Sequence, residues 1–125
     1  MIRYSTDVIV IGAGIAGVTA AIELLARGRR VLLIDRDVEA NLGGLAKESF
    51  GGLWFAGTPL QRRHGIRDGV QQGLEDWLLF AGFAADDHWP RAWAEAYVQR
   101  CIPEIHDWLR SLGVQFMPMP LWVER

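Results

Sequence analysis

Three glycines near the start of the chain, Gly12, Gly14 and Gly17, form a Gly-x-Gly-x-x-Gly pattern between an apolar run and a helix-like stretch. The apolar run, Asp7 to Ile11, is typical of a parallel strand buried on both faces. In such a turn the first glycine permits the sharp bend, the second admits a pyrophosphate, and the third lets the helix approach the strand. The spacing therefore predicts a dinucleotide site in which backbone N–H groups at the helix start hold the phosphates.

The residues that follow complete a strand, helix and strand within the first 35 positions. From Ile15 onward apolar and small residues recur at three- and four-residue steps, and Gly28 stands where a left-handed cap would end the helix. Arg30 to Ile34 is a second apolar run, so the two strands imply a right-handed parallel crossover. We therefore expect an α/β protein with a Rossmann-like FAD/NAD(P)-binding fold.

Asp35 ends the second strand 18 residues after Gly17, close to the spacing of about 20 expected for the carboxylate that binds an adenosine ribose. A carboxylate at this position repels a 2′-phosphate, so the sequence favours FAD or NAD over NADP. The neighbouring Arg36 weakens this argument. The βαβ unit alone leaves the choice between FAD and NAD open.

Length and composition exclude several other classes of protein. A chain of 125 residues permits one domain or part of one, and a net charge of -2 does not supply the basic field that nucleic acid binding needs. Glu23 and the spaced glycines interrupt the apolar stretch from Val8 to Ala26, so no membrane span is expected. The single cysteine, Cys101, excludes an intrachain disulfide and favours a cytoplasmic location.

After residues 1–35, the chain divides into a glycine-rich loop over residues 36–65 and a helical segment over residues 66–125. The loop shows neither helix nor strand periodicity, and its length of roughly 30 residues is typical of a ligand-ordered segment. In the helical segment, apolar periodicity predicts a helix over Ile66 to Ala81, with Gly82 as its stop.

A second helix is expected after a cap at Asp86 or Asp87, and Pro103 should kink or split it. Gly113 should end this helix, and a short strand is predicted over Val114 to Phe116, with Pro118 and Pro120 disfavouring its continuation. The apolar stripe of the second helix consists of Trp93, Ala96, Tyr97, Cys101, Ile105, Trp108, Leu109 and Leu112.

Few side chains follow a catalytic or metal-binding pattern. His88 and His106 lack partners at ligand spacing, which favours capping or surface roles over metal or acid–base chemistry. One basic cluster is more typical of a solvated helix entrance than of an anion site. This cluster consists of Arg62, Arg63, His64 and Arg67. No Ser/His/Asp or Cys/His arrangement is visible, so neither a catalytic residue nor a metal site is assigned.

A paired-glycine loop follows the βαβ unit and resembles the second FAD-contacting stretch of a flavoprotein family. That family contains fumarate reductase, the succinate dehydrogenase flavoprotein and 3-ketosteroid 1-dehydrogenase. The loop runs Gly43-Gly44-Leu45-Ala46-Lys47-Glu48-Ser49-Phe50-Gly51-Gly52. A later stretch, Asp107-Trp108-Leu109 followed by Leu112-Gly113-Val114 and Phe116, is also similar to the family. The sequences of Ser49–Gly52 and Gln61–Asp68 most resemble those of the dehydrogenases akin to ketosteroid dehydrogenase.

The resemblance implies an FAD-dependent oxidoreductase that transfers a hydride at a CH–CH group beside a carbonyl or carboxylate. It further implies that this chain is the N-terminal part of an FAD-binding domain and supplies the ADP-binding part of the FAD site. The catalytic acid and base groups would then lie beyond Arg125. The implied substrate is a small molecule, either a steroid-like ketone or an enoate.

Two positions depart from the family pattern. Members that bind FAD covalently carry a histidine where this chain has Leu45, so the implied flavin is noncovalent. Ala46 lacks the hydroxyl found in the fumarate reductase branch, and Ser49 is the candidate to substitute for it. The motif and the resemblance together predict these cofactor-binding residues: Gly12, Ala13, Gly14, Ile15, Ala16, Gly17, Asp35, Arg36, Asn41, Gly43, Gly44, Leu45, Ala46, Ser49, Gly51 and Gly52.

Two alternatives remain open from the sequence. An NAD-dependent dehydrogenase domain would make the paired-glycine loop incidental and would place a third strand soon after Asp35. A nucleotide-binding module without turnover would bind the cofactor and show no activity, so only an assay for both properties separates it from an enzyme.

Overall fold

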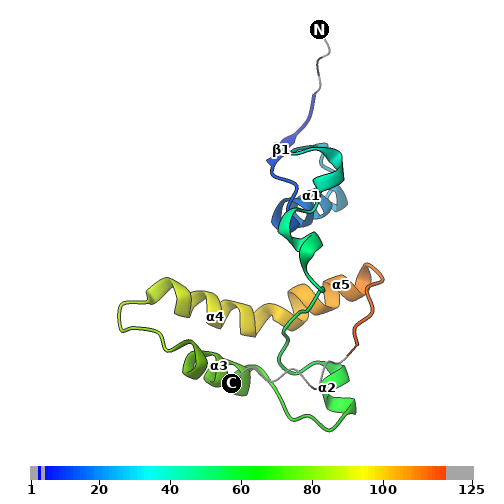
Figure 1. Cartoon of the computed structure of the whole chain (residues 1–125). Helices are drawn as coiled ribbons and strands as arrows, with labels where there is room; N and C mark the ends of the chain where they lie inside the picture. Colours follow the sequence, from blue (N-terminus) through cyan, green and yellow to red (C-terminus); the bar gives the residue numbers. More distant parts are fainter. Residues whose placement is uncertain (1–2, 4, 118–125) are drawn as a thin grey trace. The chain divides into compact units, whose positions relative to one another are not determined.

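The computed structural model describes residue 3 and residues 5–117, and it divides into two compact units, Met1–Gly52 and Leu53–Arg125 (Figure 1). The division falls within the glycine-rich loop predicted over residues 36–65. In the described part of the chain, no helix combines the length and the apolar character needed to cross a membrane.

The first unit is built on a parallel pair of strands joined by one helix. Strand β1 (Val8–Ile11) is followed by helix α1 (Ile15–Ala26) and strand β2 (Val31–Ile34). The strands pair in parallel with Val8 opposite Val31 and Ile11 opposite Ile34, which confirms the predicted order and pairing. Gly28 adopts the predicted left-handed conformation after α1, with φ at 72°.

The expectation that the strands are buried on both faces is wrong for this sheet. Val10 lies on the face that α1 covers, because its side chain is next to Gly17 of the helix. Ile9 and Ile11 alternate to the other face, where they are 56% and 82% exposed. A two-stranded sheet with one helix can cover only one of its faces, so the second apolar face stays open to solvent.

Two short 3-10 helices occupy the segment that follows β2. They are η1 (Glu39–Asn41) and η2 (Gly44–Glu48), joined by a turn in which Gly43 has a φ of 102°. That backbone conformation is one that only glycine adopts without strain. The paired glycines therefore allow the backbone to turn between η1 and η2.

The second unit is helical, and its elements are α2 (Pro59–Arg63), α3 (Val70–Ala81), α4 (His88–Arg100), the π-helical segment η3 (Cys101–His106) and α5 (Asp107–Ser111). Helices α3 and α4 pack side by side (Figure 1). The most deeply buried side chains on α4 and η3 are Ala94, Val98 and Cys101. Trp54, Trp77 and Tyr97 form an aromatic cluster, in which the Tyr97 hydroxyl donates to the Trp54 carbonyl at 2.8 Å.

The helix predicted over Ile66–Ala81 begins later than expected, at Val70. Its end is confirmed, since Gly82 caps it in the left-handed conformation. The preceding residues instead form the short helix α2, whose Thr58 and Gln61 make a reciprocal capping box. Gly65, with φ at 73°, separates the two helices.

Several expectations for the last helices have mixed outcomes. Asp87 occupies the N-cap position of α4 as predicted, but its side chain makes no capping hydrogen bond and instead accepts from the Ala84 N–H. Pro103 lies in η3, which splits the long helix as predicted. The strand predicted over Val114–Phe116 is absent, because these residues have no regular structure, while Pro118 and Pro120 lie outside the described residues. The predicted apolar stripe is offset, since Trp93 is 73% exposed while its neighbour Ala94 is fully buried.

Candidate functional site

The glycine turn between β1 and α1 has the geometry that the Gly-x-Gly-x-x-Gly spacing predicts. Gly12 has a φ of 102°, which turns the chain sharply out of the strand. A Cβ added at Gly17 would lie 1.8 Å from the Gly12 carbonyl oxygen, so the helix approaches the turn more closely than any side chain allows. A Cβ added at Gly14 would meet no atom within 4 Å, which leaves its outer side open to a ligand.

Helix α1 begins in this turn without a side-chain cap, because the residue at its N-cap is Gly14. Its first turn, from Ile15 through Ala16 to Gly17, contains no acidic residue. The N–H groups at a helix start carry a partial positive charge and lack partners within the helix. The first turn of α1 therefore offers backbone donors to an anion.

Asp35 is anchored at the same end of the sheet by backbone hydrogen bonds. Its Oδ2 accepts from the Ala13 N–H at 2.5 Å, and its Oδ1 accepts from the Asp37 N–H at 2.9 Å. The Ala13 N–H, followed by that of Asp37, holds the pKa of the Asp35 carboxyl below its usual range. An ionised carboxylate has about four acceptor positions, so Asp35 keeps acceptor capacity for a hydroxyl group beyond these backbone donors.

The paired-glycine loop returns to the glycine turn, although about 30 residues separate the two along the chain. The Gly43 N–H donates to the Ala13 carbonyl at 2.9 Å, and Gly14 and Gly43 form an isolated parallel bridge. A Cβ added at Gly44 would lie 3.5 Å from the Cα of Gly14. The structure thus brings together two of the segments that sequence reasoning assigned to the same site.

A cavity of about 310 Å³ lies beside this junction. Four of its lining residues are among those predicted from the sequence: Arg36, Asn41, Gly44 and Leu45. Three others, Asp37, Lys47 and Glu48, were missed. Asp37 organises the cavity wall, since its Oδ1 accepts from the Asn41 amide at 3.0 Å. The position of Asp37 two residues after a strand-ending Asp35 is the one signal that could have indicated it.

The last predicted residues form a local turn of their own. The Ser49 hydroxyl accepts from the Gly51 N–H at 3.1 Å, and the ring of Phe50 covers Gly52 so closely that an added Cβ would be 2.5 Å from it. Ala46 lies within η2. For these residues, as for the other residues predicted at the site, a role at the cofactor stays a prediction.

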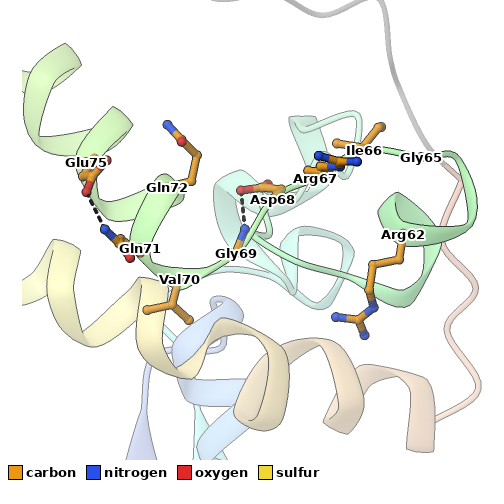
Figure 2. Close-up of a pocket in the computed structure, with 10 residues that line it drawn as sticks. All are labelled: Arg62, Gly65, Ile66, Arg67, Asp68, Gly69, Val70, Gln71, Gln72 and Glu75. Carbon is orange, nitrogen blue, oxygen red and sulfur yellow. Dashed lines mark hydrogen bonds between the residues drawn. The ribbon is translucent and has the colours of Figure 1, made fainter.

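The second unit contains a wide, open groove of about 960 Å³ beside the start of α3 (Figure 2). Arg62 and Arg67 of the basic cluster line the groove, whereas Arg63 and His64 do not. Arg62 is held by a hydrogen bond from its guanidinium to the Gly57 carbonyl at 2.9 Å. At the edge of the groove, the Asp68 carboxylate accepts a hydrogen bond from the Gly69 N–H at 2.7 Å.

The loop that carries the groove is fixed by Gln61. Its amide nitrogen donates to the Asp68 carboxylate at 2.7 Å and to the Phe55 carbonyl at 3.2 Å, while its carbonyl accepts from the Thr58 N–H at 2.6 Å. Sequence reasoning passed over this glutamine, although the spacing of Thr58 and Gln61 is that of a capping box.

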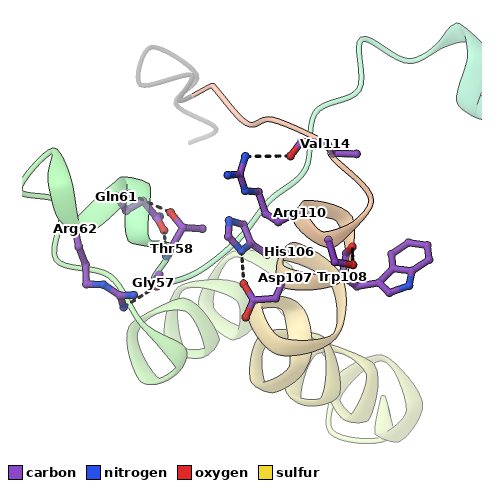
Figure 3. Close-up of polar contacts among 10 residues, drawn as sticks. Gly57, Thr58, Gln61, Arg62, His106, Asp107, Trp108, Arg110 and Val114 are labelled. Carbon is purple, nitrogen blue, oxygen red and sulfur yellow. Dashed lines mark hydrogen bonds and ion pairs between the residues drawn. The ribbon is translucent and has the colours of Figure 1, made fainter.

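Of the capping or surface roles expected for His106, the surface role is wrong, because the residue is buried. His106 precedes α5, but its side chain makes no capping hydrogen bond there. Its ring is stacked on Phe116 with centroids 5.1 Å apart and meets Phe55 edge-on at 5.5 Å. Its Nδ1 lies 2.7 Å from the Asp107 carboxylate (Figure 3). Among the residues that the structure describes, no three His, Cys, Asp or Glu side chains lie close enough together to hold a metal ion.

The geometry of the first unit fits a dinucleotide. The open side of Gly14, the uncapped start of α1 and the anchored carboxylate of Asp35 provide space, anion donors and hydroxyl acceptors within one unit. That such elements would receive the phosphate and ribose groups of an adenine dinucleotide stays a prediction.

Comparison with known proteins places this chain in a family. The model of a family described as an FAD binding domain matches residues 7–121. A KsdD-like steroid dehydrogenase of Mycolicibacterium smegmatis is 52% identical over 120 residues, which cover 95% of this chain and 22% of that protein. A probable fumarate reductase of Shewanella frigidimarina is 38% identical over 72 residues, or 58% of this chain and 12% of that protein.

A 3-oxosteroid 1-dehydrogenase of Mycobacterium tuberculosis is 34% identical over 62 residues, which cover 50% of this chain and 11% of that protein. The chain thus spans about a fifth of the length of the steroid dehydrogenase relative it matches over nearly all its residues. No solved structure matches the chain significantly.

Proposed function

Because the chain belongs to the FAD binding domain family, we propose that its first unit holds the ADP part of FAD in an oxidoreductase. The observation that carries the proposal is the junction of Gly14 with Gly43, which joins the phosphate-binding turn to the paired-glycine loop. A dinucleotide turn alone would serve NAD equally well, whereas the second glycine segment beside it resembles the second FAD-contacting stretch of the family.

The residues divide among the parts of the cofactor. The N–H groups of Ile15, Ala16 and Gly17 would receive the pyrophosphate, with Gly14 leaving room for it. Asp35 would accept hydrogen bonds from the adenosine ribose. The cavity residues Arg36, Asn41 and Leu45 would lie toward the adenosine end. These assignments rest on the motif and on the positions of the residues beside the junction.

Bound FAD supplies the chemistry of hydride transfer. The chain's own contribution is to bind and orient the nucleotide half of the cofactor. The groups near the junction suit that task, since they are backbone N–H donors, the anchored Asp35 carboxylate and the side chains that line the cavity. We propose that the complete enzyme acts at a CH–CH group of a steroid-like ketone or an enoate. The relatives' names, a KsdD-like steroid dehydrogenase and a probable fumarate reductase, support both substrate classes.

We assign the 125 residues to the N-terminal part of a Rossmann-like FAD-binding domain. The parallel β1–α1–β2 unit supports this assignment, as does the family match over nearly the whole chain. The described residues after Ile34 contain no further strand, so the third strand that an NAD-dependent dehydrogenase places soon after Asp35 is missing there. This observation favours FAD over NAD.

The cofactor is proposed to be noncovalent because Leu45 stands where covalent flavoproteins of the family have histidine. The Leu45 side chain is 89% exposed at the rim of the cavity and has no nucleophilic atom. The test is to purify the complete protein, record its visible spectrum, denature it with acid and identify the released nucleotide. Release of FAD is expected, whereas release of NAD, or colour that stays with the denatured protein, contradicts the proposal.

A further inference from the structure

Lys47 is the single lysine of the chain, whose other 12 cationic side chains of the lysine and arginine type are arginines. It lies in η2, beside the cavity at the junction of the two glycine segments. An isolated lysine in a chain that otherwise uses arginine directs attention to the contacts of its ammonium group.

The Lys47 side chain folds back across the turn that contains the paired glycines. Its ammonium group donates a hydrogen bond to the Ala40 carbonyl, seven residues earlier in the chain. Its methylene groups cross Gly43 so closely that a Cβ added there would lie 3.0 Å from the Lys47 Cγ and 3.4 Å from its Cδ. Lys47 therefore closes the turn from residue 40 to residue 47 as a strap.

The strap explains two features of the local sequence. The φ of 102° at Gly43 favours glycine, and a side chain there would also crowd the Lys47 methylenes above it. A compact ammonium on a long flexible stem can reach a backbone carbonyl in this narrow space, whereas a planar guanidinium is larger and needs a wider approach.

The turn that Lys47 closes is the one that docks on the glycine turn. The Gly43 N–H donates to the Ala13 carbonyl, and Ala13 in turn donates to Asp35. We propose that Lys47 is a positioning residue that holds residues 40–47 in the binding conformation before FAD arrives, so that the cofactor does not have to order the loop. This inference rests on the proposed function, because it concerns the same FAD site.

Ordering a loop on binding costs conformational free energy, and a loop that is already closed avoids that cost. Lys47→Met keeps the unbranched apolar stem over Gly43 and removes the ammonium donor. Arg29→Met is the matched control, since it also removes one exposed positive charge from the first unit and lies outside the loop. Both variants should be made in the complete protein, freed of cofactor by acid treatment and refolding.

The decisive measurement is amide hydrogen exchange of the cofactor-free protein over residues 40–47. In Lys47→Met we expect the Gly43 amide to exchange roughly tenfold faster than in the unsubstituted protein, and the dissociation constant for FAD to rise roughly five- to tenfold. Arg29→Met should match the unsubstituted protein in both, and the thermal transitions of all three should agree.

Unchanged exchange in Lys47→Met would overturn the inference. A weaker affinity for FAD with unchanged exchange would also overturn it, because Lys47 would then act on the bound cofactor and not on the free loop. If the unsubstituted protein bound no FAD, the proposed function would fail, while exchange in the cofactor-free protein would still decide whether Lys47 closes the loop.

Discussion

Gly17 and Gly14 lack a side chain for different physical reasons, although they belong to the same motif. Gly17 is required by the fold, since the Gly12 carbonyl oxygen occupies the space that a Cβ would need. Gly14 has an ordinary φ of -75° and open space around it, so nothing in the protein itself requires a glycine there. We propose that a ligand lying against the backbone is the reason for a glycine at this position.

We therefore expect Gly17→Ala and Gly14→Ala to separate stability from binding. Gly17→Ala should lower the free energy of unfolding by at least about 2 kcal/mol, because the clash is with backbone that cannot rotate away. Gly14→Ala should change it by less than about 0.5 kcal/mol and yet weaken FAD binding. Urea unfolding and flavin titration of the complete protein measure both quantities. Equal losses of stability in the two variants would contradict this distinction.

The anchored Asp35 makes a second prediction, for the pH dependence of stability. Its folded pKa is lowered by backbone donors, so its contribution is complete above about pH 4, the ordinary pKa of a free aspartate, and is lost as the pH falls through the folded pKa. Asp35→Asn should consequently be less stable than the unsubstituted protein at pH 7, with the difference shrinking below pH 4. Thermal unfolding at pH 7 and at pH 3 tests the sign, and a difference that grows in acid would refute it.

For single residues, the sequence predicted the positions that are defined by local spacing, but it missed a residue whose role depends on how its side chain crosses a turn. Gly12, Gly14, Gly17 and Asp35 follow a motif whose geometry is fixed by neighbouring residues. Lys47 acts by crossing a turn whose shape no periodicity indicates, and its spacing from Ala40 matches no recurring motif.

Among the elements, α3 is fitted to its surroundings by a glycine. A Cβ added at Gly73 would lie 2.8 Å from the Ala56 Cβ and 3.0 Å from the ring of Trp54, so the helix lies against the segment that precedes α2. Alanine is intrinsically about 1 kcal/mol better than glycine in a helix. Packing and helix propensity therefore oppose each other at this position.

We expect packing to prevail in Gly73→Ala, which should lower the free energy of unfolding by roughly 1 to 2 kcal/mol. Gln72→Ala, at the exposed neighbouring position, should leave stability within about 0.5 kcal/mol. Urea unfolding followed by circular dichroism measures both variants. A stabilised Gly73→Ala protein would show that Trp54 moves aside at little cost.

The helix boundaries show where periodicity misleads. Ile66 continues the apolar spacing of α3, but the left-handed Gly65 and the hydrogen bond from Gln61 to Asp68 hold it in a loop. The π-helical segment η3 also shifts the buried positions away from those that periodicity predicts. After Cys101, an α-helical period would bury Ile105, but the wider turn of η3 buries His106 instead. Periodicity assumes a constant turn, and Pro103 interrupts that turn.

At the scale of the whole molecule, the open face of the β1–β2 sheet determines how the 125-residue chain behaves by itself. Ile9 and Ile11 present exposed apolar surface on a sheet that has two strands among the described residues, and we expect this surface to promote association. Replacing both with threonine keeps β-branched residues in the strand and removes much of that surface. The doubly substituted chain should scatter less light and bind less hydrophobic dye at equal concentration.

Val10→Thr is the matched control for this prediction, because Val10 lies on the covered face near Gly17. It should destabilise the unit and leave association undiminished. If the chain carrying both threonines associates as strongly as the unsubstituted one, the open face does not drive association.

The junction between Gly14 and Gly43 has a consequence for how the protein is made. All the contacts that join the glycine turn, the anchored Asp35 and the paired-glycine loop lie within the unit that ends at Gly52. A ribosome adds residues in order at roughly 5 to 20 per second, so the proposed nucleotide-binding part is synthesised before any residue of the second unit. The turn, the carboxylate and the loop can therefore come together without any residue of the second unit.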